Sequence, residues 1–153
     1  MIALTEEQQE RVDLIIHKLK FIEQKPTVAC VTVLDPLILS NDNITELVSI
    51  AGGTAIVGGA QTLLEVDPDV IVLMPDSYSI EETMKHIGDL LELPNFSELK
   101  AVKTNRLYIA DAGQFFNDTA DNIVDSIELL AEIIYPKQFI FGNEGNGWVK
   151  FTL

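Results

Sequence analysis

Apolar residues recur along the first part of the chain with the spacing of a helix. They stand at three- and four-residue steps, at Val12, Ile15, Ile16, Leu19 and Ile22. Acidic residues come early in this segment and lysines late, and Thr5 with Gln8 forms a capping-box pattern. The pattern predicts a helix over residues 6–23 that ends before Pro26. Its apolar stripe is narrow, which is typical of a helix packed on the outside of a domain.

Three later segments have the pattern of strands that are buried on both faces. Residues 27–34 are β-branched and almost continuously apolar, as are residues 69–74, and residues 106–110 resemble them. Such runs are typical of parallel strands covered by helices on both sides. A shorter strand is expected at residues 55–57, and we expect residues 106–110 to be the last strand of the chain.

Helical patterns follow each of these strands. Asn43 with Glu46 predicts the start of a helix that ends at the glycine pair 52–53, and Ser79 with Glu82 predicts the start of another over residues 80–91. A brief helix is expected at residues 60–65, and the clearest stripe runs from Ile123 to residue 134. The glycine-rich tail, residues 141–148, is expected to fold back irregularly.

This alternation of strands and helices predicts the α/β class, with a mostly parallel sheet between two layers of helices. The 153 residues, of which 47% are apolar, suffice for one well-filled domain. No apolar run is long enough to span a bilayer. The chain is therefore expected to be one globular, three-layer domain preceded by a long N-terminal helix.

Charge excludes two classes of partner. The chain has 24 acidic and 10 basic residues, which leaves a formal charge of −14. Nucleic acids and anionic membranes both require clustered lysine and arginine, so neither nucleic-acid binding nor membrane insertion is expected. The single cysteine, Cys30, stands inside an apolar run and is expected to be a small buried residue without a disulfide.

Candidate binding residues lie in the loops that follow the three main strands, because ligands of open parallel sheets bind at the carboxyl ends of the strands. These loops span residues 35–41, 75–78 and 111–117. Their polar and aromatic members are Asp35, Ser40, Asn41, Asp76, Ser77, Tyr78, Gln114, Phe115 and Phe116. Since the loops contain no His, Cys or Lys, they favour ligand binding over catalysis.

Several of these residues also have purely structural interpretations. Asp35 and Asp76 stand beside prolines, where a turn-capping role is as well supported as a binding role. Of the adjacent Phe115 and Phe116, one is expected to face the core and the other to face outward. Tyr78 fits either an unengaged surface position or a ligand contact.

Other sites are not expected. His17 and His86 lie outside the apolar stripes of their helices and have no partner at metal-ligand spacing, so both are expected to be surface residues. The glycine pairs 52–53 and 58–59 do not form a nucleotide-binding motif. A response-regulator receiver is excluded because Met74 stands where the phosphate-accepting Asp is required. No cofactor is expected.

The order of several motifs resembles a known family. These motifs are Leu34-Asp35-Pro36 after a strand, "ITELVSIAGG" ending at Gly53, "LLEVDPDVIV" ending at Val72, "LKAVKTNRLY" ending at Tyr108 and a terminal helix ending in Tyr135-Pro136. Together they are similar to the C-terminal lobe of the substrate-binding proteins of ABC importers for cobalamin and ferric siderophores, the class III periplasmic binding proteins with a helical backbone. The resemblance covers residues 26 to about 141.

The resemblance implies a Rossmann-like lobe over residues 26–153 and a helix over residues 1–25 that connects two lobes. It also implies ligand contacts within residues 35–41, including Leu37, within residues 74–78 and within residues 114–117. In the family, a Glu before the "DPD" strand contacts the permease, and the matching residue here is Gln61, which cannot form an ion pair. The family's first lobe is absent, the segment 54–60 is shorter than usual, and residues 119–121 replace a Pro-Gly pair.

The resemblance therefore implies a non-enzymatic protein that captures a metal chelate, cobalamin or a ferric siderophore, for an ABC permease. A homodimer would supply the missing half of the cleft. The alternative is a stand-alone interaction or regulatory module derived from such a lobe. The family is periplasmic or attached to the cell envelope, whereas the first residues show no export signal, which implies the cytoplasm if the chain is complete.

Overall fold

The computed structural model describes residues 3–117 and 119–152. Residues 1–2 and 153, at the ends of the two units expected from the resemblance, lie outside the described residues. The central sheet has the order β2-β1-β4-β5-β6, and β3 also pairs with β1. Its middle is parallel: β1 (Thr27–Val33) pairs with β4 (Val70–Leu73), and β4 pairs with β5 (Leu107–Ala110). This confirms the predicted α/β class and the mostly parallel sheet.

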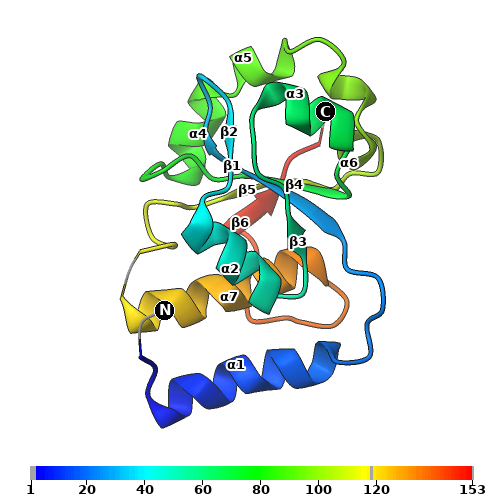
Figure 1. Cartoon of the computed structure of the whole chain (residues 1–153). Coiled ribbons are helices and arrows are strands. Elements are labelled where there is room, and N and C mark those ends of the chain that lie inside the picture. Colours follow the sequence, from blue (N-terminus) through cyan, green and yellow to red (C-terminus); the bar gives the residue numbers. More distant parts are fainter. Residues whose placement is uncertain (1–2, 118, 153) are drawn as a thin grey trace.

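Helices cover both faces of the sheet (Figure 1). On one face lie α2 (Asp42–Ile50) and α7 (Ala120–Ile134), and α1 (Glu6–Leu19) lies beyond α7 on the side away from the sheet. On the other face lie α3 (Ala60–Val66), α4 (Ile80–His86), α5 (Gly88–Leu91) and α6 (Lys100–Lys103), with a 3₁₀ turn at Phe96–Glu98. The three layers are therefore as expected, with α1 added outside them.

Each central strand supplies side chains alternately to two buried clusters. The cluster under α2 and α7 takes Val28, Cys30, Val70, Val72, Tyr108 and Ala110, and the opposite cluster takes Ala29, Val31, Ile71, Leu73, Leu107 and Ile109. Successive strand residues point to opposite faces, so a strand buried on both sides must be apolar throughout. This is why the continuous apolar runs correctly predicted these strands. Cys30 is fully buried, as expected.

The first helix is shorter than predicted and packs tightly on the domain. It ends at Leu19 and not at residue 23. Its apolar stripe belongs to the same buried cluster as α7, with Ile15 fully buried. Arg11 donates hydrogen bonds to Asp125 and Glu128 of α7, and these carboxylates raise the pKa of its guanidinium. Ile22, beyond the end of the helix, still packs against this cluster, whereas residues 23–25 are exposed.

Two predicted helix boundaries were wrong. The N-cap of α2 is Asn41 and not Asn43: the side chain of Asn41 accepts a hydrogen bond from the backbone N–H of Ile44 at 2.8 Å. The capping-box pattern selected Asn43 because only that residue is followed by an acid at the third position. The predicted helix over 80–91 is two helices, α4 and α5, that meet at Gly88. Glycine has low helix propensity, which accounts for the break.

Two edge strands were not predicted. β2 (Ile38–Leu39) pairs antiparallel with β1, and β6 (Trp148–Lys150) pairs antiparallel with β5 in the tail that was expected to be irregular. Both are too short for a periodic pattern to emerge. The predicted strand at 55–57 is β3 (Thr54–Ala55), which pairs parallel with the start of β1.

At the amino edge of the sheet, Asp69 ties β1 to β4. Its carboxylate accepts hydrogen bonds from the backbone and hydroxyl of Thr27 at 2.9 and 3.1 Å and from the ammonium of Lys100 at 2.5 Å. Hydrogen bonding to Lys100 and to the Thr27 backbone lowers the pKa of Asp69. This cross-link lies at the edge opposite to the candidate loops.

Candidate functional site

The three candidate loops lie together at the carboxyl ends of β1, β4 and β5, as the parallel sheet requires. Backbone hydrogen bonds fix the second loop: the N–H of Asp76 donates to the carbonyl of Thr32 in β1 at 3.0 Å, and the N–H of Gly113 in the third loop donates to the carbonyl of Tyr78 at 3.0 Å. The second loop is thus held between the end of β1 and the third loop. Such a scaffold fixes the positions of side chains that face a ligand.

The third loop is organised by its own polar side chains. The buried carboxylate of Asp111 accepts hydrogen bonds from the N–H groups of Gly113 and Gln114 at 2.9 and 3.1 Å. The side-chain amide of Asn122, in α7, donates to the carbonyl of Gln114 at 2.6 Å, and Ser126 accepts a hydrogen bond from the N–H of Phe116 at 2.8 Å. The loop is therefore attached to the start of α7.

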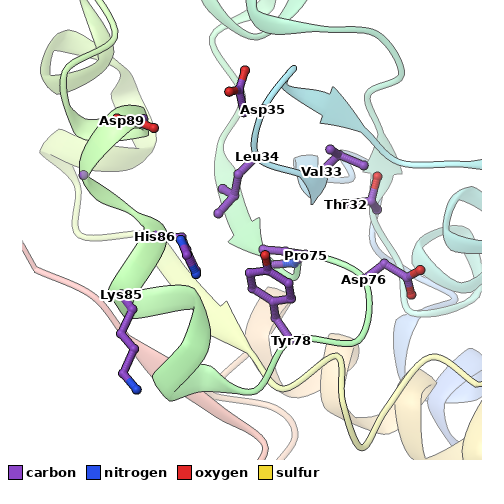
Figure 2. A pocket seen from close by; sticks show the side chains of 11 residues that line it. Thr32, Val33, Leu34, Asp35, Pro75, Asp76, Tyr78, Lys85, His86 and Asp89 are labelled. Carbon is purple, nitrogen blue, oxygen red and sulfur yellow. The ribbon is translucent and has the colours of Figure 1, made fainter.

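A hollow of about 480 Å³ opens at this edge between the end of β1, the loop after β4 and the α4–α5 junction. Figure 2 shows its side chains. They are Thr32, Val33, Leu34, Asp35, Pro75, Asp76, Tyr78, Lys85, His86 and Asp89, and Gly88 completes the wall. Three of the predicted residues, Asp35, Asp76 and Tyr78, thus line one hollow. Its volume lies within the usual range of small-molecule sites.

The rings of Tyr78 and His86 lie near each other in this hollow. Their centroids are 5.5 Å apart and their planes are tilted by 50°. Tyr78 is half-buried and His86 is exposed. His86 is a surface residue, as expected, but the fold brings it to the hollow, which its position outside the apolar stripe did not indicate. Together the two rings form an aromatic wall.

Two smaller hollows adjoin the first. One, of about 220 Å³, lies on the α2 side, shares Thr32, Val33 and Asp76 with it, and is also lined by Asn41 and Phe116. The other, of about 290 Å³, shares Leu34, Asp35 and Asp89 with the first hollow and is also lined by Leu37. The three hollows follow one another along the ends of β1 and β4. We refer to them together as the strand-end groove.

Carboxylates dominate the charge of the groove. Asp35, Asp76 and Asp89 are exposed on its rim, and none of them takes part in a side-chain hydrogen bond or ion pair among the described residues. In the described residues, the carboxylates of Asp35 and Asp76 therefore do not cap a turn by accepting hydrogen bonds from nearby backbone N–H groups. Within the described residues no group of three His, Cys, Asp or Glu side chains is arranged to hold a metal ion.

Four predicted residues line none of the hollows that the structure describes. Ser40 is 3% exposed, with a positive φ of 52°. Ser77 and Gln114 are exposed away from the groove, and Phe115 packs against the main core cluster. Phe116 packs against the same cluster, so the expectation that only one of the two phenylalanines faces the core was wrong. Both rings are half-buried, and the loop that carries them is attached to the start of α7.

Gln61 lies on the exposed side of α3, and its side-chain amide donates to the carboxylate of Glu65 at 2.8 Å. It is separate from the strand-end groove, as a contact with a different partner requires. Its role in binding a permease stays a prediction.

The residues that sequence reasoning missed come mainly from the α4–α5 junction: Lys85, His86, Gly88 and Asp89. They were assigned to a continuous helix that packs on the sheet. The glycine inside the helical pattern was the available signal, since an isolated glycine often marks an interruption of a helix.

None of the helices that the structure describes has the length and apolar character of a membrane span. No protein-family model matches the sequence. No curated protein sequence matches it either.

Solved structures do share the fold. An ABC transporter substrate-binding protein from Listeria monocytogenes aligns with a TM-score of 0.72 and 19% identity over 86% of this chain and 55% of its own. The TroA-like periplasmic binding protein FepB from Veillonella parvula aligns with a TM-score of 0.67 and 20% identity over 86% and 46% of the two chains. S. aureus IsdE, solved with heme, aligns with a TM-score of 0.67 and 21% identity over 83% and 54%.

The chain therefore has the Rossmann-like fold of one lobe of the TroA-like, class III periplasmic binding proteins, as the sequence motifs suggested. It spans about half the length of the solved proteins that it matches. By their names, the Listeria protein is a substrate-binding protein of an ABC transporter and the Veillonella protein is a periplasmic binding protein.

Proposed function

We propose that this chain is one lobe of the substrate-binding component of an ABC importer and that it captures a metal chelate in the strand-end groove. The observation that carries the proposal is the groove itself: three adjoining hollows at the carboxyl ends of β1 and β4, the usual ligand position in an open parallel sheet. Structural neighbours named for heme binding support a chelate as the ligand.

The ligand would be held by a small set of side chains. Asp35, Asp76 and Asn41 offer polar groups, while Tyr78 and Phe116 offer aromatic surface. Leu37 adds an apolar contact at one end of the groove. Ligand sites usually combine apolar surface with placed polar groups, and the groove offers both, with the polar groups prominent in its hollow of about 480 Å³.

A single lobe covers only one side of a chelate. Most small-molecule sites enclose the greater part of their ligand, so this lobe alone should bind weakly. Another lobe, joined through α1, or a second copy of the chain would complete the cleft. In the first case α1 acts as the connecting helix, and an exposed residue such as Gln61 is available to a permease. Cobalamin, heme and ferric siderophores are the candidate ligands.

The proposal is tested by titrating the purified chain with heme, cobalamin and a panel of ferric siderophores up to about 1 mM, which detects binding free energies near −4 kcal/mol. Visible absorption and thermal unfolding report binding, because a ligand that binds the native state raises Tm. We expect saturable binding of at least one chelate.

Variants connect the signal to the groove. Tyr78→Ala should weaken binding, whereas Phe21→Ala, which removes an aromatic ring that is 83% exposed and lines none of the described hollows, should leave binding unchanged. The absence of a Tm shift with every chelate would refute capture by this lobe. It would favour the alternative, an interaction module without a transport role.

A further inference from the structure

We propose that the strand-end groove selects ligands by charge: it takes a cationic or neutral chelate, with a preference for the cationic one, and discriminates against anionic chelates. The inference rests on the proposed function, because it concerns the ligand of the same groove. It follows from the charged side chains that line the hollow of about 480 Å³, which we call the main hollow, and from the charge and aromatic surface around them.

Negative charge reaches the main hollow from three separate segments. Asp35 follows β1, Asp76 follows β4 and Asp89 lies in α5 (Figure 2). Asp76 also lines the adjoining hollow on the α2 side, and Asp35 and Asp89 also line the hollow on the other side, so each carboxylate borders two of the three hollows. Its backbone is held by the hydrogen bond to Thr32, which keeps the carboxylate at the groove.

Positive charge in the hollow is small by comparison. Lys85 is the only lysine or arginine among its described lining residues. Its ammonium lies 3.8 Å from the carboxylate of Glu81, and Figure 2 shows its side chain extending away from Asp35 and Asp89. An anionic ligand would therefore meet three carboxylates without the arginine fork that recognises carboxylates and phosphates elsewhere.

The charge of the rest of the molecule also favours cationic over anionic ligands. A formal charge of −14 gives the molecule a net negative field, which attracts cations and repels anions. The ring of Tyr78, beside His86, adds an aromatic face, and aromatic faces attract cations.

The cation is not a bare metal ion. Within the described residues no three ligating side chains converge, so the carboxylates cannot replace the coordination shell of a metal. A hollow of about 480 Å³ is also much larger than one ion requires. A metal would enter already chelated, and its chelate would carry the charge that the carboxylates sense.

Three ferric trihydroxamates that differ only in one terminal group test the inference. In ferrioxamine B the terminal ammonium makes the complex cationic. Acetylation of that amine makes the complex neutral, and succinylation makes it anionic, while the iron core is unchanged. We expect affinity to fall in this order, by about 3-fold at the first step and about 10-fold overall, and the differences to shrink at high salt.

Matched variants assign the effect to the groove. Asp76→Asn should weaken binding of the cationic complex about 3-fold more than binding of the neutral complex. Glu46→Gln removes the same charge from the exposed side of α2, outside the groove, and should have no effect beyond about 1.5-fold. Lys85→Gln should strengthen binding of the cation, because it removes the one opposing charge.

The outcomes separate the two proposals. Equal affinity for the three complexes, tighter binding of the anionic one, or an equal effect of Asp76→Asn and Glu46→Gln overturns charge selection but leaves chelate capture standing. Binding of heme, which its two propionates make anionic, without binding of ferrioxamine B also overturns charge selection alone. Failure of every chelate to bind overturns both.

Discussion

Replacing Glu132 should detach the C-terminal tail and destabilise the whole domain. Glu132 lies in α7 and is 4% exposed. One oxygen of its carboxylate accepts the indole N–H of Trp148 at 2.6 Å and the backbone N–H of Asn143 at 3.2 Å. The other accepts the backbone N–H groups of Phe141 and Gly142. One buried charge therefore holds the segment that leads into β6.

The magnitude follows from these four donors. A hydrogen bond to a charged group contributes roughly 1.5–3 kcal/mol, and a buried donor left without an acceptor costs roughly 1–3 kcal/mol. The donors can reach water if the tail opens, so the costs do not add fully. We expect Glu132→Ala to lower the free energy of unfolding by about 3–5 kcal/mol. This corresponds to a fall in Tm of about 10 °C for a domain of this size.

Glu132→Gln separates the charge from the shape of the side chain. The amide keeps one acceptor oxygen but turns its own NH₂ group toward two of the N–H donors. We expect a loss of about 2 kcal/mol, between the wild type and Glu132→Ala. Glu10→Gln, an exposed change on α1, should stay within about 0.5 kcal/mol of the wild type.

The assay is urea unfolding followed by fluorescence and far-UV circular dichroism. Trp148 is the only tryptophan, so fluorescence reports on the tail directly while circular dichroism reports on the helices. In Glu132→Ala the fluorescence transition should come at lower urea than the dichroism transition, because the tail opens first. If the stability of Glu132→Ala equals that of Glu10→Gln, the carboxylate does not hold the tail and the reasoning is refuted.

Three further predictions concern the core and the amino edge of the sheet. Ile15→Ala, at a fully buried position, should lower the free energy of unfolding in urea by about 2–4 kcal/mol. Ile16→Ala, at the neighbouring position that is 48% exposed, should lower it by under about 0.5 kcal/mol. Equal effects would contradict the packing of α1 on the domain. Burial raises the pKa of Cys30 to about 12, so thiol reagents at pH 8 should label it only after denaturation, and rapid labelling of the native protein would contradict its position. Because folding lowers the pKa of Asp69, the ionised carboxylate stabilises the fold above its usual pKa, and this stabilisation is lost as the pH falls through the lower folded value. Asp69→Asn should therefore reduce Tm at pH 7 and flatten the dependence of Tm on pH below about 4. If Tm still falls as steeply with acid in the variant, the result would argue against the contact with Lys100.

The sequence by itself determined the central strands, the helices between them and the loops where a ligand would bind. Each of these features has a local cause. β1 and β4 are buried on both faces and are therefore apolar throughout, and the capping box of Ser79 and Glu82 forms between residues three apart, as the pattern predicted. Once the central strands are parallel, their carboxyl ends must share one edge. The position of the groove follows from that alone.

Tertiary structure decided which side chains meet in the groove and which strands form the two edges of the sheet. β2 and β6 are too short to show a period, and β6 depends on Glu132, which is distant from it in the sequence. His86 and Asp89 reach the hollow only because the chain breaks at Gly88, whereas Ser40 is buried. Periodicity and capping record interactions within a few residues. Contacts across the sheet depend on the packing of the whole chain, and no local pattern encodes them.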